Sequence, residues 1–376
     1  MTRDIHIDGI ERGLSKRVGP GGLGRDFRSA LTVWKGFVAD QMMGTSVLRI
    51  GIVGCGRAAR IHLDRLLALP EVQIVGCADA DEACAHAMAT KISEQIGSGS
   101  VPSFTDHRTL LRQQTPDALF LFTPHLSHYR PAMDALQAGC HLFIEKPLST
   151  NLQEAVDIVG LARSRALKVG VGHQYRLCPS IIEARRRLEQ GAIGKLRLVT
   201  ATLARPWLAT QQGAREGWRF DRKVDGGGIL ADAGDHLIDA LLWTTGRAAQ
   251  EVCVVQDELE PGLDLVTVAA IRSVDGTPMA LAVSGVSPGA LFELNLFGEQ
   301  GRMRVSDQMM EVDDAAGSLR HQVPLPSTTE SIDANFVNAL LRGTPLCCPA
   351  DEALDTVRLI EAIARSASAK QFVRLI

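Results

Sequence analysis

The chain has 376 residues, of which 45% are hydrophobic and 22% are charged, with a formal net charge of −3 at pH 7. This length allows two or three domains with large cores, and the small net charge gives no reason to expect a nucleic acid or an anionic membrane as partner. The eight cysteines have no C-x-x-C pair and no zinc-like spacing, so we expect reduced thiols and no metal site. Because the sequence contains neither 18 consecutive uncharged apolar residues nor the apolar core of a secretory signal, we expect a cytoplasmic protein.

The first 46 residues are interrupted by glycines between Gly19 and Gly24 and have only a weak apolar pattern. We expect residues 1–46 to form a mobile N-terminal extension. Translation from Met42 or Met43 is an equally good interpretation, because the first convincing strand follows within a few residues. The sequence therefore does not distinguish whether residues 1–41 are an N-terminal arm or result from a wrongly assigned start codon.

A strand, a glycine turn and a helix follow this extension. Val47–Val53 is a β-type run, residues 54–59 have the pattern G-x-G-x-x-A, and a helix is predicted over Arg60–Leu69. In dinucleotide-binding domains this turn brings the cofactor's pyrophosphate to the helix N-terminus. We therefore expect cofactor contacts from Gly54, Gly56, Arg57 and Ala58.

A carboxylate ends the second predicted strand. Val72–Ala78 leads into Asp79, which lies 20 residues after Ala59, where a carboxylate can accept hydrogen bonds from the adenosine ribose. Asp81 and Glu82 follow closely and would repel a 2′-phosphate. The sequence therefore favours NAD(H) over NADP(H).

Strands and helices then continue to alternate, as a parallel doubly wound sheet requires. We expect a polar loop after a helix over Glu82–Gln95, then a strand over Ala118–Phe122 and a helix over Tyr129–Ala138. The end of that strand carries two histidines, which either line the nicotinamide end of the cofactor or are ordinary loop residues. We assign cofactor contacts to Thr123, Pro124 and His128, and the ordinary role to His125.

The next strand, His141–Ile144, delivers Glu145 and Lys146 to its carboxyl end, the edge at which open α/β sheets bind ligands. Two plain charges at a strand end are the alternative interpretation. A helix over Asn151–Arg165 and a strand over Lys168–Gly172 complete a predicted nucleotide-binding domain, residues 47–172.

Residues 173–376 contain long runs in which apolar and polar residues alternate. This pattern predicts an α+β substrate-binding and oligomerisation domain with a large mixed or antiparallel sheet. The predicted strands are Lys195–Leu203, Val252–Glu258, Val266–Arg272, Met279–Gly285 and Leu291–Gly298, and the predicted helices are Ile181–Glu189, Ile332–Leu341 and Asp351–Ala367. Because these helices are too few to cover such a sheet on both sides, we expect a homodimer or homotetramer.

Three glycines, Gly226–Gly228, introduce a further helix in this domain. Asp232, His236 and Asp239 have the spacing i, i+4 and i+7 and would share one helical face, which aims carboxylates and an imidazole at one spot. A surface helix with a polar face is the alternative, but the many apolar neighbours argue against full solvation.

Together these residues resemble the glucose-fructose oxidoreductase, inositol dehydrogenase and rhizopine-catabolism family, Gfo/Idh/MocA. The stretches that carry the resemblance are Gly51–His62, Thr123–His128, Ala138–Ser149, Tyr175–Pro179, Gly191–Leu196 and Gly226–Trp243. The chain departs from the family pattern at His125, where asparagine is frequent, and at Leu177, where phenylalanine is frequent.

The resemblance implies that Lys146 is the family's active-site lysine, His236 its histidine and Asp232 the carboxylate one turn earlier. An imidazole titrating near neutrality would accept the hydroxyl proton, and the ammonium would stabilise the developing alkoxide. Asp232 would orient His236 or hold a substrate hydroxyl. Arg176 would reach the same cleft.

The resemblance implies an NAD-dependent dehydrogenase that acts on a sugar, sugar acid or cyclitol. Three alternatives stay open: reduction of keto groups on nucleotide-linked or acidic sugars, cleavage of glycosides through transient oxidation, and a non-catalytic cofactor-binding regulator. The joint presence of the lysine, aspartate and histidine argues against the regulator.

For the substrate we expect a small neutral polyhydroxylated ring. Trp207 and Trp218 would offer aromatic faces, and the hydroxyls would meet Arg176, Arg219, Asp232 and Asp239. The segment 205–225 is locally basic, which keeps a carboxylated or nucleotide-linked sugar as the second choice. Nearby aspartates, Asp225, Asp232, Asp235 and Asp239, are expected to offset that positive charge.

Overall fold

The structure, a computed structural model, describes residues 47–97, 99–212, 227–260, 263–314, 320–325, 327 and 330–375. The predicted N-terminal extension, Trp218, Arg219 and Asp225 lie outside these ranges. None of the described helices has the length and apolar character that a bilayer crossing needs.

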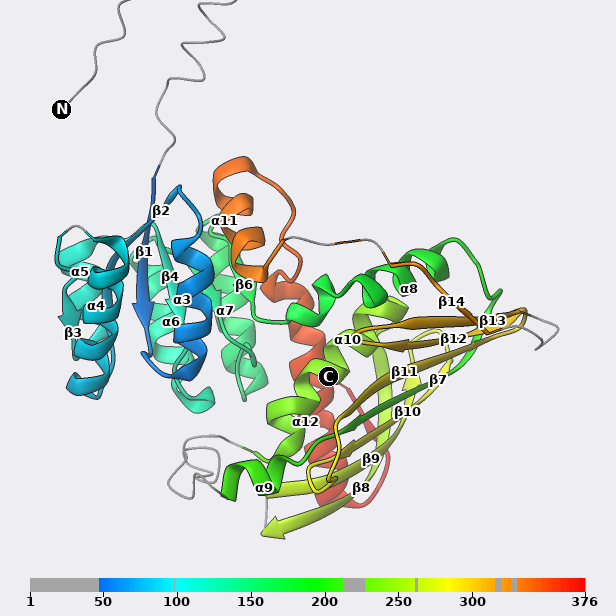
Figure 1. Cartoon of the computed structure of the whole chain (residues 1–376). Coiled ribbons are helices and arrows are strands. Elements are labelled where there is room, and N and C mark those ends of the chain that lie inside the picture. The colour runs from blue at the N-terminus through cyan, green and yellow to red at the C-terminus, as the bar shows by residue number, and fades with distance from the viewer. Residues whose placement is uncertain are drawn as a thin grey trace, which may run out of the picture. The chain divides into compact units, whose positions relative to one another are not determined.

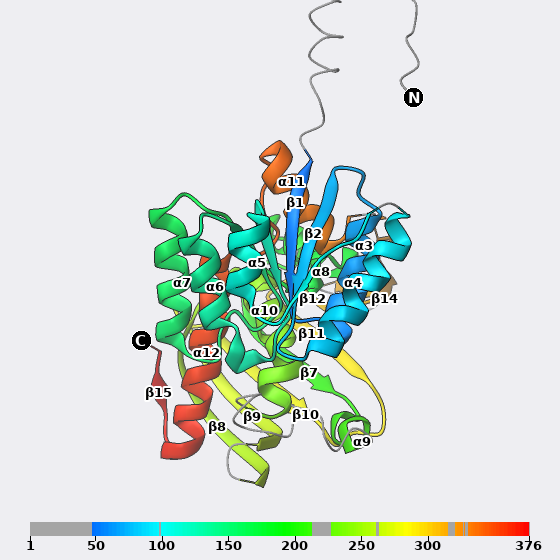
Figure 2. The same cartoon turned by 90° about the vertical axis from the view of Figure 1, so that its left-hand side faces the viewer.

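A six-stranded parallel sheet forms the first half of the described chain, in the order β3-β2-β1-β4-β5-β6. Helices cover both of its faces, with α3 and α4 on one side and α5, α6 and α7 on the other (Figure 2). This is the predicted doubly wound arrangement, and the fold class is confirmed. The strands are Leu48–Val53, Val72–Ala78, Ser103–Phe104, Ala118–Leu121, His141–Ile144 and Val169–Val171, and α3 to α7 are Arg57–Leu67, Glu82–Ile96, His107–Gln114, Tyr129–Gln137 and Leu152–Ser164.

Two local predictions need correction. Helix α3 begins at Arg57, three residues earlier than predicted, with Gly56 as its N-cap. The expected polar loop before β4 contains the short strand β3 and the helix α5, which Asp106 caps by accepting a hydrogen bond from the Arg108 amide at 3.2 Å. Helix α5 is only eight residues long, and such a short element leaves little periodicity in a sequence.

The second half contains a nine-stranded sheet, in the order β14-β13-β12-β11-β7-β10-β9-β8-β15. All neighbouring pairs are antiparallel except β7 and β10, so the sheet is mixed, as predicted. The five predicted strands correspond to β7 Leu196–Ala204, β8 Ala249–Glu260, β9 Leu263–Ser273, β10 Pro278–Ser284 and β11 Leu291–Gly298. Four further strands were not predicted from the sequence: β12 Gly301–Ser306, β13 Met310–Asp314, β14 Arg320–Gln322 and β15 Val373–Arg374.

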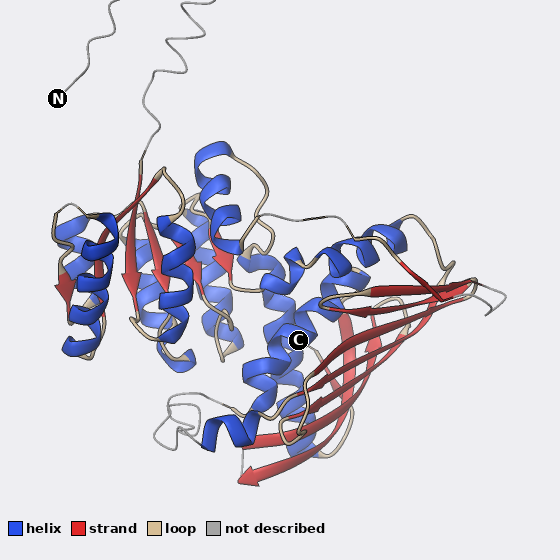
Figure 3. Cartoon of the chain, viewed as in Figure 1, coloured by secondary structure: helices blue, strands red, loops and turns tan. Residues whose placement is uncertain are grey.

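Helices pack on one face of this sheet (Figure 3). Its buried side chains form one core with those of α8 Pro179–Glu189, α10 Asp235–Thr245 and α12 Ala350–Ala369. A short helix, α9 Trp207–Gln212, follows β7, and a π-helical turn, Leu230–Gly234, leads directly into α10.

The C-terminal helices also contribute to the core of the first sheet. Phe336 of α11 (Ile332–Arg342) packs in the cluster that holds Ile50 and Phe120, and α12 begins against β6. A Cβ atom on Gly170 of β6 would lie 2.8 Å from the Phe336 ring, so glycine is needed there. The domain boundary at residue 172 stays a prediction, because the chain returns to the first sheet after residue 330 (Figure 1).

Candidate active site

A cavity of about 1030 Å³ lies at the carboxyl ends of β1, β2 and β4. This is the edge at which doubly wound sheets bind their ligands. Asp232, Thr210 and Gln211 from the second half of the chain also line it. Among its lining residues are most of the predicted cofactor contacts: Gly54, Gly56, Arg57, Ala58, Asp79, Thr123 and Pro124.

The two glycines of the turn have different roles. Gly54 has φ +85°, and a Cβ atom there would lie 2.6 Å from the main-chain carbon of Phe122. A Cβ atom on Gly56 would meet nothing within 4 Å, because it would enter the cavity. The space at the N-terminus of α3 therefore fits a pyrophosphate that approaches the backbone closely.

The Asp79 carboxylate is held in place by the backbone. One oxygen accepts a hydrogen bond from the Cys55 amide at 2.7 Å, and the other accepts one from the Asp81 amide at 2.9 Å. Each carboxylate oxygen keeps a further lone pair. The carboxylate is thus oriented at the cavity wall and can still accept ribose hydroxyls.

Lys146 lies between the two halves of the site. Its Nζ donates to the carbonyl oxygen of Asp232 at 2.7 Å and to the carboxylate Oδ1 at 2.8 Å. Burial alone would lower the pKa of Lys146, but Asp232, Asp235 and Glu145 outweigh it and raise the pKa above its usual value. Lys146 is therefore a buried, permanently charged ammonium.

His236 follows the π-helical turn, half-buried, at the start of α10. Burial, followed by the charge of Lys146, lowers the pKa of His236 to about 4, so the imidazole is neutral at pH 7. Its Nδ1 is buried and has no hydrogen-bond partner within the described part of the chain. An orphaned polar atom at such a place is typical of a group that meets a ligand.

The predicted common face of Asp232, His236 and Asp239 is only partly correct. The carboxylate of Asp232 bonds to Lys146 and to the Trp207 indole, whose Nε1 donates at 2.9 Å, while Asp239 bonds to Arg176. The π-helical turn Leu230–Gly234 contains more residues per turn than an α-helix. The predicted common face assumed 3.6 residues per turn, so it does not place Asp232 and His236 correctly relative to each other.

The N-terminus of this helix is held by Asp264 of β9, which the sequence analysis missed. The Asp264 carboxylate accepts hydrogen bonds from the amides of Gly228 and Leu230, both at 3.1 Å. A Cβ atom on Gly228 would lie 2.1 Å from the Asp264 carbonyl oxygen, which explains why this position is glycine. No local signal reveals this cap, because it lies 36 residues further along the chain.

A second missed group supports Glu145. The Glu145 Oε1 lies 3.2 Å from Nε2 of His62, whose Nδ1 lies 2.5 Å from Asp333 of α11. Burial would lower the pKa of His62, but these two carboxylates raise it to about 9. The other oxygen of Glu145 accepts a hydrogen bond from the Lys146 amide at 3.0 Å, so the chain of contacts ends at Lys146.

Two regions of the sequence match known protein families. Residues 48–173 match the oxidoreductase family with the NAD-binding Rossmann fold, and residues 181–304 match the GFO/IDH/MocA C-terminal domain. The chain belongs to the Gfo/Idh/MocA family. The expected oxidoreductase class and the NAD-binding fold are thereby confirmed.

Curated relatives in this family match part of the chain. D-glucoside 3-dehydrogenase of Escherichia coli (strain K12) is 27% identical over 210 residues, which cover 55% of this chain and 56% of that enzyme. UDP-N-acetylglucosamine 3-dehydrogenase of Acidithiobacillus ferrooxidans is 29% identical over 160 residues, 43% of this chain and 46% of that enzyme. In both comparisons the chain spans about half the length of the relative.

Solved structures extend the similarity of fold over most of the chain. Levoglucosan dehydrogenase in complex with NADH and levoglucosan has a TM-score of 0.77 at 19% identity, covering 87% of this chain and 99% of that one. The WlbA dehydrogenase from Bordetella pertussis, in complex with NADH and UDP-GlcNAcA, has a TM-score of 0.73 at 24% identity, with coverage of 88% and 99%.

Several predicted site residues of this Gfo/Idh/MocA protein are not among the residues that line the cavity. Lys146 adjoins it through its bond to Asp232, and His236 follows Asp232 by four residues. His128 is fully buried, with Nδ1 2.8 Å from the Pro147 carbonyl and Nε2 2.9 Å from the Thr123 carbonyl, so it fixes two loops and offers nothing to a cofactor. Glu145 does not line the cavity; its carboxylate contacts the Lys146 amide and the His62 ring instead. Trp207, expected to present its ring to a sugar, is only 4% exposed.

Arg176 is also corrected, because its guanidinium is occupied. It donates to both carboxylate oxygens of Asp239 at 2.7 to 3.1 Å, to the Cys347 carbonyl and to Glu352. Nearby, His173, Asp239 and Cys348 bring three potential ligand atoms within 4.8 Å. Arg176 already supplies the positive charge to Asp239, so we interpret the group as a structural ion-pair network.

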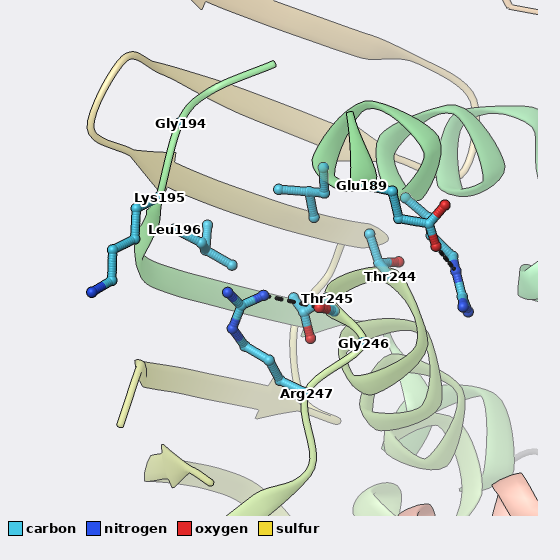
Figure 4. Close-up of a pocket in the computed structure, with 10 residues that line it drawn as sticks. Glu189, Gly194, Lys195, Leu196, Thr244, Thr245, Gly246 and Arg247 are labelled. Carbon is cyan, nitrogen blue, oxygen red and sulfur yellow. Dashed lines mark hydrogen bonds and ion pairs between the residues drawn. The ribbon is translucent and has the colours of Figure 1, made fainter. Parts of the chain in front are cut away.

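A smaller cavity of about 200 Å³ lies at the C-terminus of α10 (Figure 4). Three of the charged residues that line it serve the fold. Arg185 pairs with Glu189 at 2.9 Å, and Arg247 donates to the Thr245 carbonyl at 2.9 Å and pairs with Asp275. These cations complement the negative end of the helix, so we do not assign a ligand to this cavity.

Proposed function

We propose that this protein is an NAD(H)-dependent dehydrogenase that interconverts a secondary alcohol and a ketone on a sugar or cyclitol ring. The observation that supports this is the bond between the Lys146 ammonium and Asp232, which lines the cavity together with Gly56 and Asp79. The neutral His236 imidazole follows Asp232 by four residues. The family membership and the dehydrogenases among its relatives agree with it.

Each residue has a role that follows from its contacts. The nicotinamide, when bound, accepts or donates the hydride. Lys146 stabilises negative charge on the substrate oxygen, because its own charge is fixed by Asp232. His236 takes the hydroxyl proton, and its low pKa keeps it unprotonated at neutral pH while Lys146 makes the hydroxyl more acidic.

The preference for NAD(H) rests on Asp79. Its carboxylate, oriented by the amides of Cys55 and Asp81, can pair with a free ribose diol and would repel a 2′-phosphate. Titration of the protein with NADH and NADPH tests this directly. Equal affinities, or an Asp79→Ala variant with unchanged preference, would contradict the assignment.

The chemical roles are tested by NAD reduction with a panel of sugars and cyclitols. Lys146→Ala and His236→Ala should each lower turnover by roughly 10²-fold or more with nearly normal NADH affinity. Asp232→Asn should lower it less, because the Lys146 ammonium keeps the Asp232 carbonyl as a partner. Near-normal turnover in either alanine variant would remove that residue from the mechanism.

A further inference from the structure

Arg205 directly follows β7 and precedes α9. Its amide donates to the Ser284 carbonyl at 2.9 Å, which fixes the backbone at the end of the strand. Trp207, two residues later, bonds to the Asp232 carboxylate, and Thr210 and Gln211 of the same helix line the large cavity. Arg205 is thus anchored beside the candidate active site, although no individual role was predicted for it from the sequence.

The guanidinium of Arg205 lies one aromatic ring away from His236. Its Nη2 donates to the Tyr175 hydroxyl at 2.9 Å, and the centre of the Tyr175 ring lies 5.2 Å from that of His236. Tyr175 is held by Phe292, which stacks on it at 4.3 Å with the planes 9° apart. This stack fixes the position of the guanidinium relative to the catalytic imidazole.

Within the described residues, no carboxylate forms an ion pair with Arg205, and its buried Nε has no partner. Other half-buried arginines here are paired, such as Arg247 with Asp275 and Arg304 with Glu293. Asp307 influences the Tyr175 phenol electrostatically but does not bridge to the guanidinium. A cation with an unsatisfied buried donor needs an oxyanion or water to complete its hydrogen bonds.

Asp225 lies outside the described residues, and the other three acidic residues expected to offset this positive charge are already paired. Asp232 binds Lys146 at 2.8 Å, Asp235 lies 2.6 Å from His173, whose pKa is raised well above its usual value despite burial, and Asp239 binds Arg176. Each of these acids neutralises its own cation. The charge balance that favoured a neutral substrate therefore does not extend to Arg205.

We propose that the substrate carries an oxyanion, either a ring carboxylate or the phosphate of a nucleotide-linked sugar, and that Arg205 binds it with the Tyr175 hydroxyl. This inference rests on the proposed dehydrogenase function and specifies its substrate class. The guanidinium supplies planar, paired donors that suit carboxylate and phosphate geometry. Acidic sugars, the second choice of the sequence analysis, become the first.

The test compares kcat/KM for NAD reduction with matched pairs: D-glucuronate with D-glucose, D-galacturonate with D-galactose, and UDP-N-acetylglucosamine with N-acetylglucosamine. We expect at least one anionic member to exceed its neutral partner by at least tenfold. Arg205→Gln should lower the value for that anion by roughly 10- to 100-fold while that for the neutral partner changes less than threefold. Arg205→Lys should recover part of the loss, because it restores the charge without the planar donors.

Arg197→Gln is the matched control, because Arg197 lies on β7, the strand that Arg205 follows. Its side chain is 60% exposed and pairs with Glu299 at 3.6 Å, and it does not line the cavity. It should leave every value unchanged. Preference for the neutral sugars, or an equal effect of Arg205→Gln on both members of a pair, would overturn the inference while leaving the dehydrogenase intact.

If no sugar supports NAD reduction, the proposed dehydrogenase function is contradicted, but anion binding by Arg205 can still be tested. Calorimetry on the NADH-bound protein measures that binding. Binding of D-glucuronate or UDP-N-acetylglucosamine by wild type and loss of that binding in Arg205→Gln would support the inference. Equal binding by both proteins, or none by wild type, would overturn it. The two classes of anion distinguish a ring carboxylate from a phosphate.

Discussion

At the scale of single residues, the state of His236 determines how the proposed reaction should respond to pH. We expected an imidazole titrating near neutrality, but burial and the neighbouring Lys146 charge lower the pKa of His236 to about 4. Because the depressed pKa favours the neutral imidazole, the base should stay competent down to mildly acidic pH.

We therefore predict that the acid limb of kcat/KM falls below about pH 5 and that no loss occurs between about pH 5.5 and 7. A pH–rate profile checks this, with circular dichroism at each pH to show that the protein stays folded. An acid limb near pH 6.5 would contradict the low pKa of His236 in the free enzyme.

At the scale of elements, the two glycines of the turn between β1 and α3 have different roles: we expect Gly54 to be needed for stability and Gly56 for cofactor binding. Gly54→Ala places a side chain at φ +85° and against the main chain of Phe122, so we expect a loss of roughly 2–4 kcal/mol in the free energy of unfolding. Gly56→Ala meets open space and should leave stability close to wild type while weakening NADH binding by at least about tenfold. Urea denaturation and fluorescence titration of both variants measure this, and equal destabilisation would be evidence against separate roles.

His62 of α3 contacts a residue that follows β5 and a residue of α11, and from these contacts we predict that the free energy of unfolding depends on pH. The groups that face His62 are Glu145, Asp333 and the rings of Phe122 and Phe143, while Arg65 pairs with Asp333. The folded pKa of His62, about 9, lies above the unfolded value of about 6.5. The stabilisation is therefore fully present below pH 6.5 and is lost as pH rises through 9.

The maximum contribution is roughly 3 kcal/mol, from a shift of about 2.5 units. His62→Gln should remove this part of the pH dependence, so the difference in stability between wild type and variant should shrink from pH 6.5 to 9.5. Urea denaturation across that range measures it. Parallel curves for the two proteins would show that His62 is not charged in the folded state.

At the scale of the whole molecule, none of the helices that the structure describes covers one face of the nine-stranded sheet (Figure 1). The helices α8, α10 and α12 pack on the other face (Figure 1), and Val255 and its cross-strand partner Val268 are 76% and 50% exposed. Ala270 and Ala280 extend this apolar surface over β9 and β10. Exposed apolar surface of this kind is typical of an interface between subunits.

We therefore predict a homodimer or homotetramer that buries this face, measured by light scattering at micromolar concentration. The double variant Val255→Glu, Val268→Glu should dissociate it, because it brings carboxylates into the interface of both subunits. Phe372→Glu is the control, since Phe372 is exposed but precedes the edge strand β15 and does not lie on β8 or β9. A monomeric wild-type protein would contradict the prediction.

The sequence by itself determined the doubly wound sheet, the glycine turn, Asp79 at the end of β2 and Lys146 at the end of β5. These features are local: a strand, its turn and the residue that ends it lie within a few positions of one another, so periodicity and turn chemistry specify them. The family resemblance added Asp232 and His236, which belong to one continuous stretch of chain.

Only the tertiary structure decided which of these groups meet. Asp264 caps the helix that carries His236 from a strand 36 residues away, and Asp333 reaches His62 across 271 residues. Arg176 was assigned to the substrate, but Asp239, Cys347 and Glu352 converge on it from other elements. Arg205, in contrast, keeps its charge without an acidic partner among the described residues. Ion pairing depends on distances that close only when the chain is folded, and for this reason the charge that a substrate would meet could not be determined from sequence.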